Sequence, residues 1–160
     1  MSDSFSHLDE SGNPHMVDVG AKNATLRTAR AQCLVDLGPD VLARLQGQEW
    51  NSPKGPVFQT AILAGIMGAK KTGELIPLCH PLGLDNCQIE IGVNDQDLVV
   101  ISCTATIHAK TGVEMEALTG ASIAALTLYD MCKALSHDIV IKELKLMEKT
   151  GGKKDFHRMK

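Results

Sequence analysis

Carboxylates and a lysine lie at the two ends of one alanine-rich segment of this 160-residue chain. Glu114 and Glu116 begin the segment, and Asp130 and Lys133 end it. An acid and a lysine three residues apart share one side of a helix, where a partly desolvated pair can supply a base and an acid for proton transfer. The same spacing is typical of a solvated salt bridge, which is the simpler explanation of this pair taken alone.

The length of this segment separates its two ends. Glu116 and Asp130 are 14 residues apart, which corresponds to roughly 21 Å along a helix axis. One small-molecule pocket cannot span that distance. We therefore expect each end to complete a pocket with another element or another subunit.

His80 follows Cys79 in the proline-broken segment 76–82. Pro81 favours an extended backbone at His80, which suits a base or a hydrogen-bond donor to an anion, although a structural histidine fits the same pattern. Two adjacent residues cannot easily ligate one zinc ion, and no second Cys/His cluster has metal spacing. The sequence therefore predicts no metal site.

Several cations lie beside glycines or in loops. Lys54 precedes Gly55, Lys149 precedes Thr150-Gly151-Gly152, Lys22 follows Gly20, and Arg27 lies in the first predicted strand. Each alone is typical of a solvated surface charge. Together they are what a phosphate or pyrophosphate group requires, and because no Walker loop is present, such a site is assembled from separate segments.

Composition excludes some partners. The net charge of −3 and the 3% aromatic content provide neither a basic surface nor a stacking platform for nucleic acid. Five scattered cysteines without a CxxC pair favour a reducing compartment. The start of the chain lacks the apolar run of a signal peptide and no apolar stretch reaches membrane length, so we expect a cytoplasmic protein without membrane contact.

The pattern predicts one domain at residues 15–150, with a flexible N-terminal segment at 1–14 and a flexible Gly/Lys-rich tail at 151–160. Strands are predicted at 24–37, where the pattern also allows a helix, at 89–93 and 98–107 as a hairpin, and at 139–147. Helices are predicted at 40–46, at 56–72 with Gly73 as the stop, and after a capping box of Thr111 and Glu114. This order indicates an α+β, ferredoxin-like sandwich, a mainly antiparallel sheet with helices packed on one face.

Five motifs in order carry a resemblance to a known family. They are Met16-Val17-Asp18-Val19, Leu75 to Leu82, Lys110 to Thr119, Tyr129 to Lys133 and Lys149 to Lys153. From about His15 to Lys153 the chain resembles the cyclic pyranopterin monophosphate synthases, molybdenum cofactor biosynthesis protein C. The resemblance implies a phosphorus–oxygen lyase that converts 3′,8-cyclo-7,8-dihydroguanosine 5′-triphosphate into cyclic pyranopterin monophosphate and pyrophosphate. It also implies a homohexamer, a trimer of dimers with active sites at subunit interfaces.

Carried over by motif, Asp130 and Lys133 match the family's catalytic residues. The resemblance implies a substrate-binding role for Asp18, Arg27, Lys54, Leu78, Cys79, His80, Glu114, Met115, Glu116 and Lys149. No cofactor is required by the sequence, and Mg²⁺ is expected at most as a phosphate counterion. Gly20 and Pro56 stand where the family commonly has Ser and Asp.

Two expectations remain to be weighed against the structure. Lys54 is taken as a residue that a partner chain supplies to the pocket containing Asp130. The competing function is a non-catalytic nucleotide-binding or assembly module on the same scaffold.

Overall fold

The central strand of the fold is β1, Thr25–Asp36, in the computed structural model, which describes residues 5–159. Its inward side chains are small or apolar and fully buried, from Ala29 and Ala31 to Cys33 and Val35. β1 pairs antiparallel with β5, Val99–Ala109, on one side and with β6, Val140–Thr150, on the other. The alternation in β5 is equally regular, so both strands present one buried face to the helices.

Two further strands extend this sheet at its edges. β4, Asn86–Val93, pairs with β5, and β7, Phe156–His157, pairs with β6. The resulting order is β4-β5-β1-β6-β7, with antiparallel neighbours throughout. The four long strands therefore have the ferredoxin-like arrangement, and the predicted α+β class is confirmed. A separate two-residue ladder joins β2, Asn51–Ser52, to β3, Gly55–Pro56.

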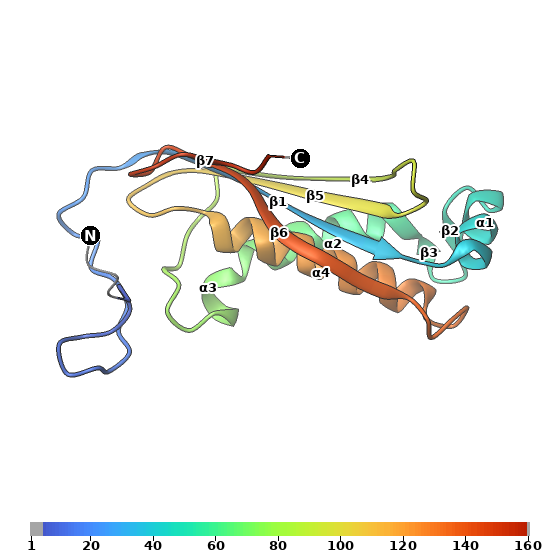
Figure 1. Cartoon of the computed structure of the whole chain (residues 1–160), viewed down its shortest axis with the longest axis horizontal. Helices are drawn as coiled ribbons and strands as arrows, with labels where there is room; N and C mark the ends of the chain where they lie inside the picture. Colours follow the sequence, from blue (N-terminus) through green and yellow to red (C-terminus); the bar gives the residue numbers. More distant parts are fainter. Residues whose placement is uncertain (1–4, 160) are drawn as a thin grey trace.

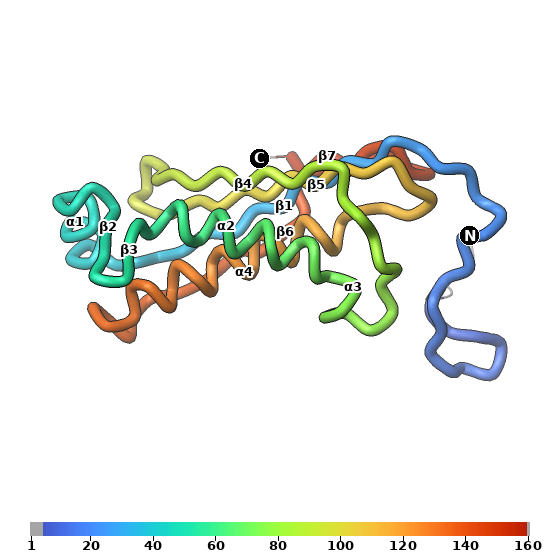
Figure 2. The backbone as a smooth tube through the Cα atoms, turned by 180° about the vertical axis from the view of Figure 1, so that it is seen from behind, coloured from blue at the N-terminus to red at the C-terminus, as the bar shows by residue number. Residues whose placement is uncertain are grey.

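The helices cover one face of the sheet. α2, Val57–Lys70, and α4, Glu114–Cys132, run side by side beneath it (Figures 1 and 2). α1, Pro39–Gly47, lies with β2 and β3 at one end of the sheet, and the short α3, Thr72–Leu75, lies toward the other end (Figure 1). Among residues 5–159, no helix combines the length and the apolarity needed to cross a membrane.

Glycine and alanine allow α2 and α4 to approach closely. A Cβ atom placed on Gly65 would overlap the side chain of Ile89 and lie 2.8 Å from the carbonyl oxygen of Gly120. A Cβ on Gly120 would lie 2.6 Å from Sγ of Cys103 in the sheet. Both contacts are shorter than side chains tolerate, so these positions accept only glycine without movement of their neighbours.

The predicted elements agree with this structure with two exceptions. The strands at 24–37, 89–93, 98–107 and 139–147 and the helix at 40–46 are confirmed. The capping box is wrong, because α4 begins at Glu114 without a side-chain cap and the Glu114 carboxylate accepts a hydrogen bond from Lys149 instead. Gly73 is not the stop of the preceding helix, since α2 ends at Lys70 and Gly73 lies within α3.

Both terminal segments contain backbone pairing. Phe156–His157 of the predicted tail forms β7, so part of 151–160 joins the sheet. Leu8 and Pro14 form a bridge within the predicted N-terminal segment. The remainder of that prediction, residues 1–4, lies outside the described residues.

We predict that Gly65→Ala destabilises the protein by about 1–3 kcal/mol, because the added methyl group meets the backbone carbonyl of Gly120 on α4 as well as the side chain of Ile89. Urea unfolding at one fixed protein concentration measures the change. The control is Gly47→Ala, whose added Cβ has no neighbour within 4 Å. Equal midpoints for Gly65→Ala and Gly47→Ala would show that the helix contact is looser than described.

Candidate active site

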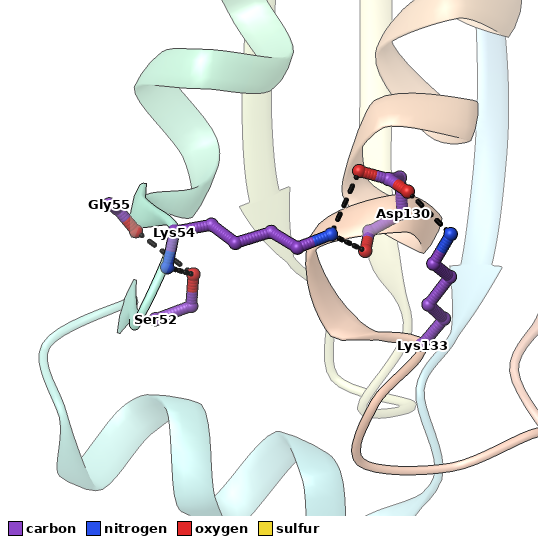
Figure 3. Close-up of polar contacts among 5 residues, drawn as sticks. All are labelled: Ser52, Lys54, Gly55, Asp130 and Lys133. Atoms are coloured by element: carbon purple, nitrogen blue, oxygen red, sulfur yellow. Dashed lines mark hydrogen bonds and ion pairs between the residues drawn. The ribbon is translucent and has the colours of Figure 1, made fainter.

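At its C-terminal end, α4 presents Asp130 between two lysines. Nζ of Lys133 donates to Oδ1 of Asp130 at 2.8 Å, one turn along the chain. Nζ of Lys54 donates to Oδ2 at 3.1 Å and to the backbone carbonyl oxygen of Asp130 at 3.0 Å. Figure 3 shows the two ammonium groups on opposite sides of one carboxylate. The structure therefore brings together the two predicted catalytic residues and one predicted phosphate ligand.

The turn between β2 and β3 positions Lys54. Oγ of Ser52 donates to the carbonyl oxygen of Gly55 at 3.2 Å and accepts from the backbone N–H of Lys54 at 3.1 Å. Gly55 has a φ of 114°, a conformation that side chains disfavour. Pro56 then stands in an extended conformation directly before α2, where its missing N–H costs little. The Ser52 hydrogen bonds and the glycine conformation together fix the shape of this turn.

Lys54 and Asp130 contact each other within one chain. The expectation that a partner chain supplies Lys54 to the Asp130 pocket is therefore wrong for this pair. The cause is the tertiary fold, because the β2–β3 turn lies against the end of α4 (Figure 3).

The N-terminal end of α4 lines a polar cavity of about 210 Å³. Six predicted binding residues line it: Leu78, Cys79, His80, Glu114, Met115 and Glu116. Sequence reasoning missed His7, named Lys22 only among the cations that suit a phosphate, and quoted Val17 and Val19 only as part of a motif. Lys22 carried a usable signal, since it is a cation beside Gly20, whereas nothing in the local sequence marked His7.

A basic cavity of about 390 Å³ adjoins the polar cavity, and the two share Lys22, Gly112 and Glu114. Its cationic wall consists of Lys22, Arg27, Lys149, Lys153 and Lys154. Nζ of Lys149 donates to Oε1 of Glu114 at 3.0 Å, and Nη2 of Arg27 donates to the carbonyl oxygen of Lys110 at 3.3 Å. Nε of Arg27 is buried without a partner among the described residues. Positive charge therefore exceeds negative charge along this cavity.

The glycines after Lys149 bring this wall against β1. Gly151 has a φ of 87°, and a Cβ there would overlap the carbonyl group of Leu26. A Cβ on Gly152 would lie 2.9 Å from Nη1 of Arg27. Glycine at these positions lets the chain pass closely over Arg27.

His80 and Asp18 make local contacts in the single chain. Nε2 of His80 donates to the carbonyl oxygen of Val17 at 2.7 Å, which leaves Nδ1 as its second polar atom. The Asp18 carboxylate is exposed and accepts from the backbone N–H of Gly20 at 2.8 Å. Asp18 lies in the segment that passes the polar cavity but does not line it.

The predicted phosphate ligands divide between the two ends of α4. Lys54 lies at the C-terminal end with Asp130, whereas Arg27 and Lys149 line the basic cavity at the N-terminal end. Because α4 is continuous from Glu114 to Cys132, the roughly 21 Å separation of Glu116 and Asp130 expected for a helix applies. The predicted site residues of one chain therefore form two groups. One half-site surrounds Asp130 at the C-terminal end of α4, and the other consists of the polar and basic cavities at its N-terminal end.

Comparison with known proteins shows which family this chain belongs to. The sequence profile of the MoaC family matches residues 16–152, which include both half-sites. The chain belongs to the MoaC family.

Relatives of this MoaC chain are similar over most of its length. A cyclic pyranopterin monophosphate synthase of Xanthomonas campestris pv. campestris (strain B100) is 50% identical over 152 residues, which are 95% of this chain and 92% of the relative. A molybdenum cofactor biosynthesis bifunctional protein of Synechocystis is 51% identical over 94% of this chain. Molybdenum cofactor biosynthesis protein 1 of Dictyostelium discoideum is 49% identical over 93% of it. The matched region spans 45% of the Synechocystis protein and 26% of the Dictyostelium protein.

The charges at the Asp130 end of the MoaC chain stabilise each other. The hydrogen bond from Lys133 is the largest cause that lowers the pKa of Asp130, and the hydrogen bond from Lys54 is the next largest. The hydrogen bond with Asp130 raises the pKa of Lys133. All three side chains are about half exposed. The expected partly desolvated pair, tuned as base and acid near neutral pH, is therefore not what the single chain contains. Mutual attraction moves both pKa values away from neutrality, and Asp130 and Lys133 are both charged.

The polar cavity has the opposite electrostatics. Glu116 is only 4% exposed, and burial, with a smaller contribution from Glu114, raises its pKa. Burial raises the pKa of Cys79, and the negative charge of Glu116 raises it further by a smaller amount. The Cys79 thiol is therefore protonated at neutral pH and is a poor nucleophile.

We predict that Lys133→Met raises the pKa of Asp130 toward the ordinary aspartate range, and does so more than Lys54→Met, because the Lys133 hydrogen bond is the largest cause of the lowered value. Carboxyl ¹³C shifts followed through a pH titration measure it. Since the folded-state pKa lies below the unfolded one, the stabilisation from this contact is present at neutral pH and is lost as the pH falls through the folded-state pKa. Lys145→Met, which removes a lysine paired with Glu143, is the control. An unchanged Asp130 pKa in both test variants would refute the contact.

Proposed function

We propose that this chain is a cyclic pyranopterin monophosphate synthase of molybdenum cofactor biosynthesis. It converts 3′,8-cyclo-7,8-dihydroguanosine 5′-triphosphate into cyclic pyranopterin monophosphate and pyrophosphate, which makes it a phosphorus–oxygen lyase. Membership of the MoaC family and the name of the Xanthomonas relative support this activity. The observation that carries it is the Asp130 carboxylate held between the ammonium groups of Lys54 and Lys133.

This arrangement suits a reaction at a triphosphate. The reaction rearranges a purine-derived ring system, closes a cyclic phosphate and expels pyrophosphate, so protons and negative charge both move. Lys54 and Lys133 place two positive charges where a departing pyrophosphate is stabilised. A bound triphosphate also competes with Asp130 for the two lysines. That competition raises the pKa of the carboxylate and turns Asp130 into a better proton acceptor.

At the other half-site, the two cavities bind different parts of the substrate. The basic cavity, with Arg27 and Lys149, offers the charge that phosphate oxygens require. The polar cavity contains Glu114 and the buried Glu116, which repel phosphate but accept hydrogen bonds from the N–H groups of a guanine-derived ring. Leu78, Cys79, His80 and Met115 then enclose the ring.

Assembly joins the two half-sites. We propose a homohexamer, a trimer of dimers, in which the Asp130 end of one chain meets the cavities of another. Leu63 and Met67 on α2 and Leu126 on α4 are exposed by 62%, 51% and 56%. Exposed apolar side chains on helices are compatible with an interface between subunits.

The remaining parts of the proposal concern ions and location. Mg²⁺ acts at most as a counterion of the substrate triphosphate. The protein works in the cytoplasm, without nucleic acid or membrane partners. A non-catalytic nucleotide-binding or assembly module is the rival function, and release of pyrophosphate from the cyclic guanosine triphosphate substrate distinguishes the two.

We predict that Asp130→Asn and Lys133→Ala each fold and assemble normally but lose about 10² to 10⁴ in turnover, because each removes a group that moves or positions a proton. Pyrophosphate release from the purified substrate measures turnover, and circular dichroism and light scattering check fold and assembly. Asp95→Asn, in the exposed turn between β4 and β5, and Lys145→Ala are matched controls. Near-wild-type turnover of both test variants would remove this contact from the chemistry.

We also predict complementation between the two half-sites. Asp130→Asn and Lys149→Ala alter opposite ends of α4 and the adjoining cavity, so a mixed oligomer contains some sites in which both half-sites are intact. After subunit exchange, we expect partial recovery of pyrophosphate release. Lys54→Ala with Asp130→Asn is the negative control, because these residues contact each other in one chain. No recovery despite measured exchange, or full activity of a monomer, would argue against shared sites.

A further inference from the structure

The N-terminal segment 5–20 folds against the polar cavity. Within it, Leu8 bridges Pro14, and the backbone N–H of His15 donates to the carbonyl oxygen of His7 at 2.9 Å. The Asp9 carboxylate accepts from the backbone N–H groups of Ser11 and Asn13 at 2.9 and 2.8 Å. These bonds give the segment a defined loop despite its polar composition.

Two side chains from the cavity region hold this segment. His80 donates to the carbonyl oxygen of Val17, as described above, and Nζ of Lys110 donates to the carbonyl oxygen of Gly20 at 2.9 Å. His80 itself lines the polar cavity, and Lys110 directly precedes Thr111 and Gly112, which also line it. The loop that carries His7 is therefore attached at the cavity edge.

His7 is the residue by which this loop enters the site. It lines the polar cavity together with Cys79, His80 and Glu116, and it lines a neighbouring apolar cavity formed by Ile76, Pro77, Leu78 and Met115. Within residues 5–159, its imidazole makes no hydrogen bond. The imidazole, a planar ring with two polar nitrogens, thus lies at the boundary between the polar cavity and the apolar cavity.

We infer that His7 contacts the guanosine-derived ring of the substrate, a conclusion that rests on the proposed function. Glu114 and Glu116 face one lysine, Lys22, among the residues that line the polar cavity, so a phosphate is better accommodated in the adjoining basic cavity than near His7. A planar heterocycle has the two properties that this boundary matches, a face for stacking and an edge for hydrogen bonds. His7 is therefore a substrate-binding residue contributed by a loop outside the ferredoxin-like core.

Binding measurements on the full chain separate ring contacts from phosphate contacts. We expect His7→Ala to weaken calorimetric binding of guanosine triphosphate by about tenfold, and to leave binding of inorganic tripolyphosphate unchanged. His15→Ala is the matched control, because His15 lies on the same loop, is exposed and lines neither cavity. Equal affinities of the two variants for guanosine triphosphate would overturn the inference. The inference would also be overturned if His7→Ala lost the same affinity for tripolyphosphate as for guanosine triphosphate. It would be overturned as well if the wild-type protein bound guanosine triphosphate no more tightly than tripolyphosphate.

A second measurement requires no substitution. Diethyl pyrocarbonate modifies exposed imidazoles, and mass spectrometry reports the rate at each histidine. We expect saturating guanosine triphosphate to slow modification of His7 in the wild-type protein and to leave His15 unaffected. Equal rates at His7 with and without guanosine triphosphate would contradict a ring contact.

Turnover separates this inference from the proposed function. If the wild-type protein releases pyrophosphate while His7→Ala keeps the wild-type KM, the function stands and the role of His7 is refuted. If the wild-type protein releases none while His7 is protected by guanosine triphosphate, the ring contact stands and the synthase proposal is refuted.

Discussion

The close contact between α2 and α4 is the constraint on which the rest of this structure depends. Gly65 and Gly120 remove the side chains that would otherwise separate the two helices from each other and from the sheet. With Ala117, Ala121 and Ala124 fully buried along α4, little side-chain volume lies between helix and strand. Small residues give each contact little area, so stability depends on how closely the backbones approach. The two half-sites sit on the ends of the helix that this contact holds in place.

A rigid helix also explains why the site is divided. α4 places Glu114 and Glu116 at one end and Asp130 at the other, and a continuous helix cannot bring those ends together. In the proposed hexamer, one substrate reaches both ends because they come from different copies of the chain. Each half-site has a different electrostatic character, because Asp130 is exposed and neutralised by two lysines, whereas Glu116 is buried beside another acid. The first suits phosphate transfer, and the second suits recognition of a ring that donates hydrogen bonds.

Ion pairs within the single chain hold lysines at both ends of α4. Lys54 and Lys133 bind Asp130, and Lys149 binds Glu114. Under the proposed function, a bound triphosphate carries more charge than either carboxylate and competes for these lysines. Release from the lysines is then what makes the acids available for proton transfer.

The sequence by itself determined the elements and the residue types. Alternating apolar residues identified the β4–β5 hairpin and favoured a strand at β1, where the pattern also allowed a helix. The motifs around His80, Glu116 and Asp130 indicated the family before any geometry was known. Such signals are local, because period and motif are properties of neighbouring residues. The start of α4 was misread for the same reason, since the Glu114 carboxylate bonds Lys149, which lies 35 residues away, and not the nearby backbone.

Only the tertiary structure decided which residues meet. Lys54 and Asp130 are 76 residues apart, and nothing local to either shows that they contact each other within one chain. Likewise, His7 lines the cavity in a segment whose later residues, Val17 and Gly20, accept hydrogen bonds from the distant side chains of His80 and Lys110. Contacts between distant segments depend on how strands and helices pack, and that packing reflects the summed shape and burial of the whole core. The sequence therefore determined the residue types and the family, and the fold determined that the predicted site residues gather at two separate ends of α4.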